Sequence, residues 1–475
     1  QNINLSLNPE SIELMQVDVT AEEIERLNKI EPSRVNLSPR ILKSQPSLAE
    51  PDIFRTIQSL PGVLTTSEFS TGLVIRGGNT DQNLILLDGI TVYNPSHLGG
   101  LFSNFIVDAV KDAELIKGGY NAEYGGRLSA VLDIRSREGN RNKIEGSSSV
   151  SLLTAQTTIE GPIPGGAFLV AGRRTYFDKV LPYVTDNFDL PYYFYDYQFK
   201  TNLDLNENHR LTYTRFYGDD ILSFSASDQS TNDIGGSSKN TYGVDWPWGN
   251  HTNGLTWRWI VSPKIVAKTF LASSRYRYDF DFYFDTKETY IDNDSTFQNS
   301  LAFDVVYKDI IKDQTLETEI IWKANDKHTI TSGFQVKNIN FELVNKFIIT
   351  TPDTTFTEKP LDMRNKTREM AAFIQDKWSV TNNLKLQGGL RLAHYNLHDT
   401  LYVEPRIGMK YNFSSDMSFK INWGRYHQFL ITANDPDENF RLIDLWLGLP
   451  EDKPASVSDH TILGLEYFSP DDILY

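Results

Sequence analysis

The chain has 475 residues, enough for two or three ordinary domains or for one large β architecture. Hydrophobic residues make up 40% and charged residues 23%, a balance that excludes disorder for most of the chain. Asp and Glu (62) outnumber Lys and Arg (46), and the net charge of −16 disfavours nucleic acid as a partner because the phosphate backbone is also negative. No run approaches the roughly 18 apolar residues of a membrane helix, whereas the alternating strands of a β-barrel remain possible.

The residue inventory does not support catalysis or a metal site. Without cysteine, the chain has neither disulfides nor a thiolate that could act as nucleophile or metal ligand. The eight histidines are scattered, and His394 and His398, on an expected strand and loop, do not converge on a metal as they would on a helix. The sequence also lacks a phosphate loop and a dinucleotide fingerprint. We therefore expect a protein that is not an enzyme and that holds no cofactor or metal.

Residues 1–50 are expected to form an extended N-terminal segment. Scattered polar residues surround four prolines, which suit an extended path better than a packed element: Pro9, Pro32, Pro39 and Pro46. No signal peptide follows Gln1, so any export sequence is expected to lie outside this chain.

Residues 51–142 are expected to form a compact α+β domain that begins with a helix. Pro51 suits the first helical turn and Asp52 the positive end of the helix dipole. Ile53, Ile57 and Leu60 then share one apolar face.

Short strands and glycine-rich turns fill the rest of this domain. Asp88-Gly89 between apolar runs predicts a two-residue hairpin and no further role. Phe102–Val110 is expected to form a second short helix, and 114–117 and 128–135 are expected to be strands.

Residues 143–475 show a different pattern, with segments of about ten alternating residues joined in turn by tight turns and long polar loops. This asymmetry puts all tight turns on one rim of a barrel and all long loops on the other. The expected tight turns are 206–209, 262–264, 324–327, 381–383 and 414–416, and the expected long loops are 218–250, 284–311, 343–365 and 427–456.

The alternation separates an apolar face from a polar one. In 384–392, leucines at even positions alternate with Lys385, Gln387 and Arg391. In 266–282 the odd positions include Arg275, Arg277, Asp279 and Asp281, and the even positions include Phe270, Tyr276, Tyr278, Phe280 and Phe282, so we expect the charged side to face water and the aromatic side to face lipid headgroups. A soluble antiparallel sandwich is the commoner source of such alternation, but continuously charged faces and aromatics near strand ends favour a membrane barrel, with about thirteen strands in this chain.

Taken in order, the motifs resemble those of the TonB-dependent outer-membrane receptors, over nearly the whole chain. The opening helix ends in Leu60-Pro61-Gly62-Val63, and an arginine-glycine strand end precedes the Asp-Gly hairpin, as in the plug domain of that family. The matching segments are 51–63, 74–78, 84–90, 113–118, 124–126 and 130–134 in the plug, and 372–378, 388–391 and 405–408 in the barrel. Any one of them is weak evidence, whereas all of them in order are strong evidence.

This resemblance implies a mainly β protein of the outer membrane of a Gram-negative bacterium. It implies a transmembrane antiparallel barrel of about 22 strands, with residues 51–142 as an α+β plug in its lumen. Because the chain supplies only part of that barrel, we expect it to be a fragment of a longer protein. The segment 4–21 resembles the one that follows a regulatory-like domain in receptors of Bacteroidota type.

The function implied is active import of a scarce ligand, such as a siderophore, glycan or peptide, with the plug gating the barrel. The partners implied are outer-membrane lipid, TonB with its inner-membrane energising complex and, as in some SusC-like relatives, a surface lipoprotein. Met15, Val17 and Val19 alternate in a segment that can add a strand to TonB, although a simple linker would read the same way. The alternative function is a non-transporting scaffold for surface lipoproteins, as in some SusC-like relatives.

Three groups of residues are candidates for sites. Tyr93, Asn94, Ser96 and His97 resemble a loop at the plug apex that contacts substrate, and an ordinary surface loop is the alternative. Trp246 and Trp248, in the first expected long loop, are candidates for external ligand binding or for an interfacial position. In the plug, charged residues are expected to gate or to stabilise by pairing with one another or with the barrel wall: Arg76, Glu114, Arg127 and Asp133.

Overall fold

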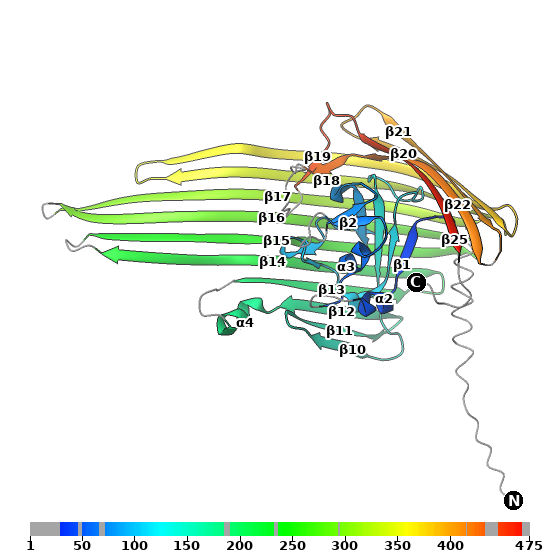
Figure 1. The fold of residues 1–475 in the computed structure, drawn as a ribbon, viewed down its shortest axis with the longest axis horizontal. Helices are drawn as coiled ribbons and strands as arrows, with labels where there is room; N and C mark the ends of the chain where they lie inside the picture. Colours follow the sequence, from blue (N-terminus) through cyan, green and yellow to red (C-terminus); the bar gives the residue numbers. More distant parts are fainter. Residues whose placement is uncertain are drawn as a thin grey trace, which may run out of the picture.

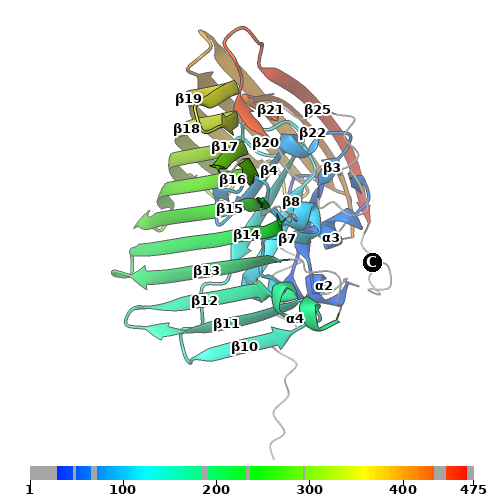
Figure 2. The ribbon, with the colours of Figure 1, turned by 90° about the vertical axis from the view of Figure 1, so that its left-hand side faces the viewer.

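The computed structural model describes residues 29–45, 50–65, 72–184, 191–231, 236–292, 295–414, 416–432 and 445–467. A large curved sheet, called the wall below, curves around a small N-terminal α+β domain, the plug (Figures 1 and 2). No helix among the described residues is long and apolar enough to cross a membrane.

The plug is built on a mixed five-stranded sheet with the order β1-β8-β9-β4-β5. Only β4 and β9 run parallel to each other. The strands are β1 (Arg34–Leu37), β4 (Asn83–Leu87), β5 (Ile90–Thr91), β8 (Val110–Ile116) and β9 (Ala130–Ser136).

The predicted helix is present as α3 (Ile53–Gln58), which packs on this sheet, but it is shorter than expected because Pro51 precedes its N-cap and Leu60 follows its C-cap. Asp52 caps it, because the Asp52 carboxylate accepts a 3.0 Å hydrogen bond from the Arg55 backbone N–H. Ile53 and Ile57 are fully buried in a core that they share with Leu115 and Leu132 of the sheet.

Two expectations about the plug are wrong. The N-terminal segment is not extended throughout, because β1 pairs with β8 and the short helix α2 (Pro39–Ser44), capped by Ser38, follows it. Phe102–Val110 does not form a helix and instead contains β7 (Phe102–Ser103) and the 3₁₀ turn η3 (Val107–Ala109). Tertiary packing overrides the helical spacing there, since Phe102 is buried against the wall and Ile106 lies in a cluster with Leu169.

Asp88-Gly89 forms the predicted hairpin between β4 and β5. Both residues have positive φ, 51° and 84°, as a type I′ turn requires. The expectation that they serve only as a turn is wrong, because the Asp88 carboxylate also lies 2.8 Å from Lys200 Nζ of the wall.

The wall is a 14-stranded antiparallel sheet, one strand more than expected, in which neighbours in sequence are neighbours in the sheet as far as β22. Two small strands, β23 (Leu430–Thr432) and β24 (Trp446–Gly448), precede the last one. The fourteen strands are β10 (Glu145–Val150), β11 (Thr154–Ile163), β12 (Gly166–Thr175), β13 (Tyr192–Asp204), β14 (His209–Thr231), β15 (Ser237–Ser262), β16 (Ile265–Asp292), β17 (Ser295–Lys323), β18 (His328–Thr350), β19 (Thr355–Ser379), β20 (Leu384–Tyr395), β21 (Leu401–Asn412), β22 (Met417–Gln428) and β25 (Ser456–Tyr467). The remaining elements are β2 (Val63–Thr65), β3 (Leu73–Ile75), β6 (Ser96–His97), η1 (Thr80–Gln82), η2 (Leu98–Gly100) and α4 (Phe177–Val184).

The five predicted tight turns all fall between consecutive strands, but three of the four predicted long loops are wrong. β14 to β19 continue through the expected loops and form long hairpins that project beyond the rest of the wall (Figure 1). β17 alone has 29 residues, whereas about 9–11 tilted residues cross a bilayer. These stretches resemble loops in the sequence because strands outside the hydrocarbon layer need no apolar face.

The expected orientation of 266–282 is also wrong. Tyr276 is fully buried, and the Phe270 ring lies 3.6 Å from the Cβ position of Gly89 in the plug, so the aromatic even positions face the lumen. Arg277 lies on the other face, where its guanidinium is 2.8 Å from Asp219. This part of the wall lies against the plug, and its lining is therefore aromatic.

Aromatic side chains do surround the outside of the tight-turn rim. They are between 38% and 57% exposed, next to the turns that follow four strands, β15, β17, β19 and β21, as in an interfacial girdle: Trp257, Trp259, Trp322, Trp378, Tyr411 and Phe413.

Candidate functional site

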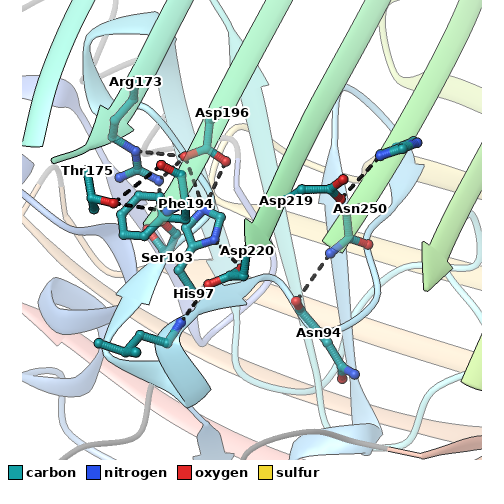
Figure 3. A network of polar contacts seen from close by, with 12 residues as sticks. Asn94, His97, Ser103, Arg173, Thr175, Phe194, Asp196, Asp219, Asp220 and Asn250 are labelled. Carbon is teal, nitrogen blue, oxygen red and sulfur yellow. Dashed lines mark hydrogen bonds and ion pairs between the residues drawn. The ribbon is translucent and has the colours of Figure 1, made fainter. Parts of the chain in front are cut away.

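A buried histidine of the plug is held between two carboxylates of the wall (Figure 3). His97 Nδ1 lies 2.6 Å from Asp220, and His97 Nε2 lies 2.9 Å from Asp196. The imidazole also stacks on Phe194, with ring centroids 4.0 Å apart. All three polar side chains are at most 1% exposed, so this contact joins plug and wall without solvent.

The same carboxylates bind further partners. Arg173 of β12 donates from Nε to Asp196 over 2.8 Å and from Nη2 to the Ser103 carbonyl of the plug over 2.7 Å. Arg173 also forms an ion pair with Glu50 at the start of the plug, while Tyr192 donates to Asp220. We call Glu50, His97, Arg173, Tyr192, Asp196 and Asp220 the His97 network.

Backbone strain helps to place His97. Asn94 and Leu98, on either side of it, have φ of 45° and 48°, a region that residues other than glycine seldom adopt. The Leu98 N–H donates a 3.0 Å hydrogen bond to Asp220, which stabilises the turn at the wall.

The environment of His97 favours its charged form. Burial lowers the pKa of an imidazole, but the nearby carboxylates of Asp196 and Asp220 outweigh burial and raise the pKa of His97 to about 9. His97 is therefore a cation at neutral pH, and the plug–wall contact is an ionic one.

The other predicted apex residues are also directed at the wall. Tyr93 is 1% exposed, and its hydroxyl donates to Asp313 over 3.0 Å. Asn94 accepts a 3.1 Å hydrogen bond from Trp446 Nε1, and its carbonyl accepts one of 3.2 Å from Asn250. Ser96 is half-buried beside them. The structure thus brings the four residues together, with Tyr93 and His97 fully engaged by the wall.

Trp246 and Trp248 lie on strand β15, not in a loop, and point inward, so the interfacial alternative is wrong. Their register with Leu222 and Asp220 places them on the lumen face. Their rings are 5.1 Å apart, and Trp248 stacks on Tyr192 at 6.1 Å. They belong to the same aromatic cluster as Tyr93.

A second plug–wall contact lies on the far side of the plug. Arg406 Nη1 donates to the Tyr124 carbonyl over 2.7 Å, and Arg391 Nη1 donates to the Glu123 carbonyl over 3.2 Å. A Cβ added at Gly125 would collide with the Arg391 guanidinium, so glycine permits this close approach.

The predicted pairing of the charged plug residues is partly wrong. Glu114 pairs with Lys29, Arg34 and Arg135, and Asp133 pairs with Arg135, so both carboxylates bind cations of the plug rather than Arg76, Arg127 or the wall. Arg76, exposed at a strand end, donates to Ser33. Arg127 lies 5.1 Å from the Trp446 ring centroid, and this is its contact with the barrel part of the chain.

Between the two contacts, plug and wall enclose a polar cavity of about 450 Å³. Its plug side carries Asp88, Asp133 and Arg135, and its wall side carries cations and anions close together: Lys200, Lys268, Glu317, Glu319 and Lys337.

Among the described residues, no group of three or more His, Asp or Glu is placed to hold a metal ion. Met15, Val17 and Val19 lie outside the described residues.

Sequence reasoning missed the wall half of the His97 network. Asp196 stands alone in the aromatic run Tyr192–Phe199, and Arg173 follows an apolar strand start. A lone charge on the aromatic face of a strand was the available signal, because such a charge needs a buried partner.

Comparison with known protein families agrees with an N-terminal plug packed against a β wall. The family described as "TonB dependent receptor-like, beta-barrel" matches residues 171–441, and "TonB-dependent Receptor Plug Domain" matches residues 39–131. The chain belongs to the TonB-dependent receptor family, whose members are outer-membrane β-barrel proteins and not enzymes. No curated protein matches the chain.

Solved structures share the fold at low sequence identity. The ferric enterobactin receptor PfeA of Pseudomonas aeruginosa is 15% identical with a TM-score of 0.51, over 94% of this chain and 70% of that one. BauA, the ferric preacinetobactin receptor of Acinetobacter baumannii, is 11% identical (TM-score 0.56, 92% and 69%). The RagAB peptide transporter is 10% identical (TM-score 0.57, 92% and 66%). These likenesses support the fold alone.

Proposed function

We propose that this protein imports a scarce ligand across the outer membrane of a Gram-negative bacterium, with TonB supplying the energy and the plug gating the barrel. The observation that carries the proposal is the His97 network, a solvent-free ionic contact between plug and wall. Removing one partner from a buried ion pair costs about 3–5 kcal/mol, so such a contact opens only when work is done on it.

The work enters through the N-terminal segment. Met15, Val17 and Val19 are the proposed TonB contact, by addition of a strand to the sheet of TonB. The segment leads to Glu31 and β1, so traction reaches the edge strand of the plug sheet first. The similarity of this lead-in supports a receptor of Bacteroidota type.

The ligand class stays open among siderophores, glycans and peptides, because the structural neighbours include two ferric siderophore receptors and a peptide transporter. Asn94 and Ser96 are the proposed ligand contacts at the apex, with Tyr93 and His97 positioning their loop. Trp246 and Trp248 line the lumen above them.

Deletion of residues 1–21 tests this function. In a strain that depends on this receptor for growth on a limiting iron, glycan or peptide source, the truncated receptor should reach the outer membrane in normal amounts and fail to support growth. Growth equal to that of the intact chain would contradict TonB-driven import.

A second candidate function is a scaffold that anchors a surface lipoprotein or a larger outer-membrane assembly. The hairpins of β14 to β19 favour it, because they project far beyond a bilayer (Figure 1). Here the 1–21 deletion gives the opposite result: recovery of surface partners with the receptor persists, and growth on limiting medium is unaffected.

A further inference from the structure

An apolar groove lies on the outer face of the wall, close to the tight-turn rim. It has a volume of about 560 Å³ and crosses strands β19 to β22. Its apolar lining consists of Trp378, Leu386, Gly388, Ile407, Met409, Ile421 and Trp423.

The strand register shows that this lining faces away from the plug. Gln387 donates to Asn121 of the plug, so its neighbours Leu386 and Gly388 point outward. Gly388 pairs with Asp376 on one side and with Ile407 on the other, and Ile407 pairs with Trp423. Ile407 is 60% exposed, which agrees with an outward position.

The hollow depends on one glycine. A Cβ added at Gly388 would meet no other atom within 4 Å, so the space above it is empty. The neighbouring large side chains form the walls of the groove, and any longer side chain at 388 would occupy it.

One end of the groove is acidic. Asp376 is placed on the outer face by its pairing with Gly388, and one of its carboxylate oxygens lies 2.6 Å from His328 Nδ1. Its other oxygen, Oδ1, is buried and has no hydrogen-bond partner among the described residues. A carboxylate at a lipid-facing position is costly and requires a partner.

The lining contains no cation. Lys377, the nearest lysine in sequence, points to the opposite face, where Nζ lies 3.8 Å from Glu31 of the plug. The groove therefore combines apolar walls with an acidic end, which matches an acyl chain attached to a headgroup that ends in an ammonium group.

We propose that this groove binds one membrane phospholipid with an amine headgroup, of the phosphatidylethanolamine class. One acyl chain fills the space above Gly388 between Ile407 and Trp423, and the ammonium group binds the Asp376 carboxylate, whose side chain is 37% exposed. The tight-turn rim faces the periplasm in this family, so the lipid belongs to the inner leaflet. The proposal rests on the outer-membrane location given under the proposed function.

Native mass spectrometry of the purified full-length receptor in detergent tests the site, with added phosphatidylethanolamine or phosphatidylglycerol of identical acyl chains. We expect one phosphatidylethanolamine to bind, about tenfold more tightly than phosphatidylglycerol. Gly388→Leu should abolish this binding. Asp376→Asn should remove the headgroup preference and leave the binding of the acyl chain.

Gly172→Leu is the matched control. Gly172 also lies on the outer face of a strand, next to inward-facing Arg173, and an added Cβ would be in ordinary contact with the Tyr197 ring at 3.6 Å and the Asp196 carbonyl oxygen at 3.9 Å. This variant should bind lipid as the unmodified protein does. A heat-modifiable band on electrophoresis shows for each variant that the barrel has folded.

Three outcomes would overturn the proposal: equal lipid binding by Gly388→Leu and Gly172→Leu, a headgroup preference that survives Asp376→Asn, or a receptor dimer that Gly388→Leu dissociates, which would assign the groove to a second copy. Lipid binding is measured without any transport assay, so a failure of import would not contradict the proposed lipid site. Absence of the receptor from the outer-membrane fraction would refute both.

Discussion

At the scale of single residues, buried ion pairs hold the plug against the wall. His97 comes from the plug, whereas Asp196 and Asp220 come from neighbouring wall strands, so each ion pair spans the plug–wall boundary. Because all of them are shielded from water, each pair depends on its partners being present together.

Replacing His97 by Gln should loosen the plug while the barrel stays folded. The variant leaves Asp196 and Asp220 buried with weaker partners, at a cost of about 3–5 kcal/mol to the plug–wall contact. Hydrogen exchange followed by mass spectrometry should show faster exchange in peptides covering 94–103. His251→Gln is the control, because His251 also contacts an aspartate, Asp219 at 3.3 Å, but on the outer face. Equal exchange in both variants would contradict the role given to His97.

The contact should also weaken at high pH. The pKa of His97 is raised to about 9 in the folded protein, above its ordinary value near 6.5. The stabilisation is therefore complete below about pH 6.5 and is lost as the pH rises through about 9. The titratable and charged groups packed around His97 are Asp196, Asp220, Arg173, Tyr192 and Glu50.

Limited proteolysis of the plug at pH 7 and pH 10 measures this change. Cleavage should increase at pH 10 in the unmodified protein, whereas His97→Gln should be cleaved readily at both values. An unmodified plug that resists cleavage equally at both pH values would contradict a charged His97.

At the scale of elements, the edge strand β1 is the part of the plug that the proposed pull by TonB would reach first. It contributes four residues at the end of the sheet, paired only with β8. Glu31, just before it, is buried, and Lys377 and Arg34 outweigh the effect of burial and lower its pKa to about 2. The ion pairs of Glu31 and the pairing of β1 with β8 thus anchor the N-terminal end of the plug.

A disulfide between β1 and β8 should block this first step. Val35 and Leu115 are direct cross-strand partners, at a spacing that suits a disulfide. The chain has no cysteine of its own, so Val35→Cys with Leu115→Cys can form only the intended bond. In force spectroscopy on the N-terminus, the oxidised variant should lose the first extension event, and reductant should restore it. An unchanged first event would show that unfolding starts elsewhere.

The elements also show what the sequence can and cannot predict. Asp88-Gly89, the capped helix at Ile53 and the five tight turns depend on local chemistry, and they were predicted correctly. The partners of Glu114 and the orientation of Phe270 depend on which face of the wall the plug packs against. The spacing of residues in the sequence does not determine that face. Long strands such as β17 were predicted as loops because outside a bilayer both faces of a strand are polar enough to resemble one.

At the scale of the whole molecule, the hairpins of β14 to β19 project far beyond the rest of the wall (Figure 1). β17 spans roughly 95 Å if fully extended at 3.3 Å per residue, about three times the hydrocarbon thickness. The upper part of these hairpins is therefore not needed for the barrel to cross the membrane.

Shortening the tallest hairpin tests this division. Asp285 and Ala302 face each other across β16 and β17, so residues 285–302 can be replaced by Asn-Gly without a change of register. The shortened receptor should reach the outer membrane and keep its heat-modifiable barrel, with its melting temperature within a few degrees of the unmodified value. Loss of membrane assembly would show that the projection contributes to barrel folding.

The plug is fastened at the His97 network and at the 120–124 loop, and the side between them borders the polar cavity, where the Asp88–Lys200 ion pair is one of the plug–wall contacts. A small tilt of the plug away from this side would break these contacts first and widen a space that is already hollow. Under the proposed import function, a ligand could then pass without ejection of the whole plug and without loss of both the His97 network and the contact at the 120–124 loop. As long as one of these two contacts held, the barrel would leak little.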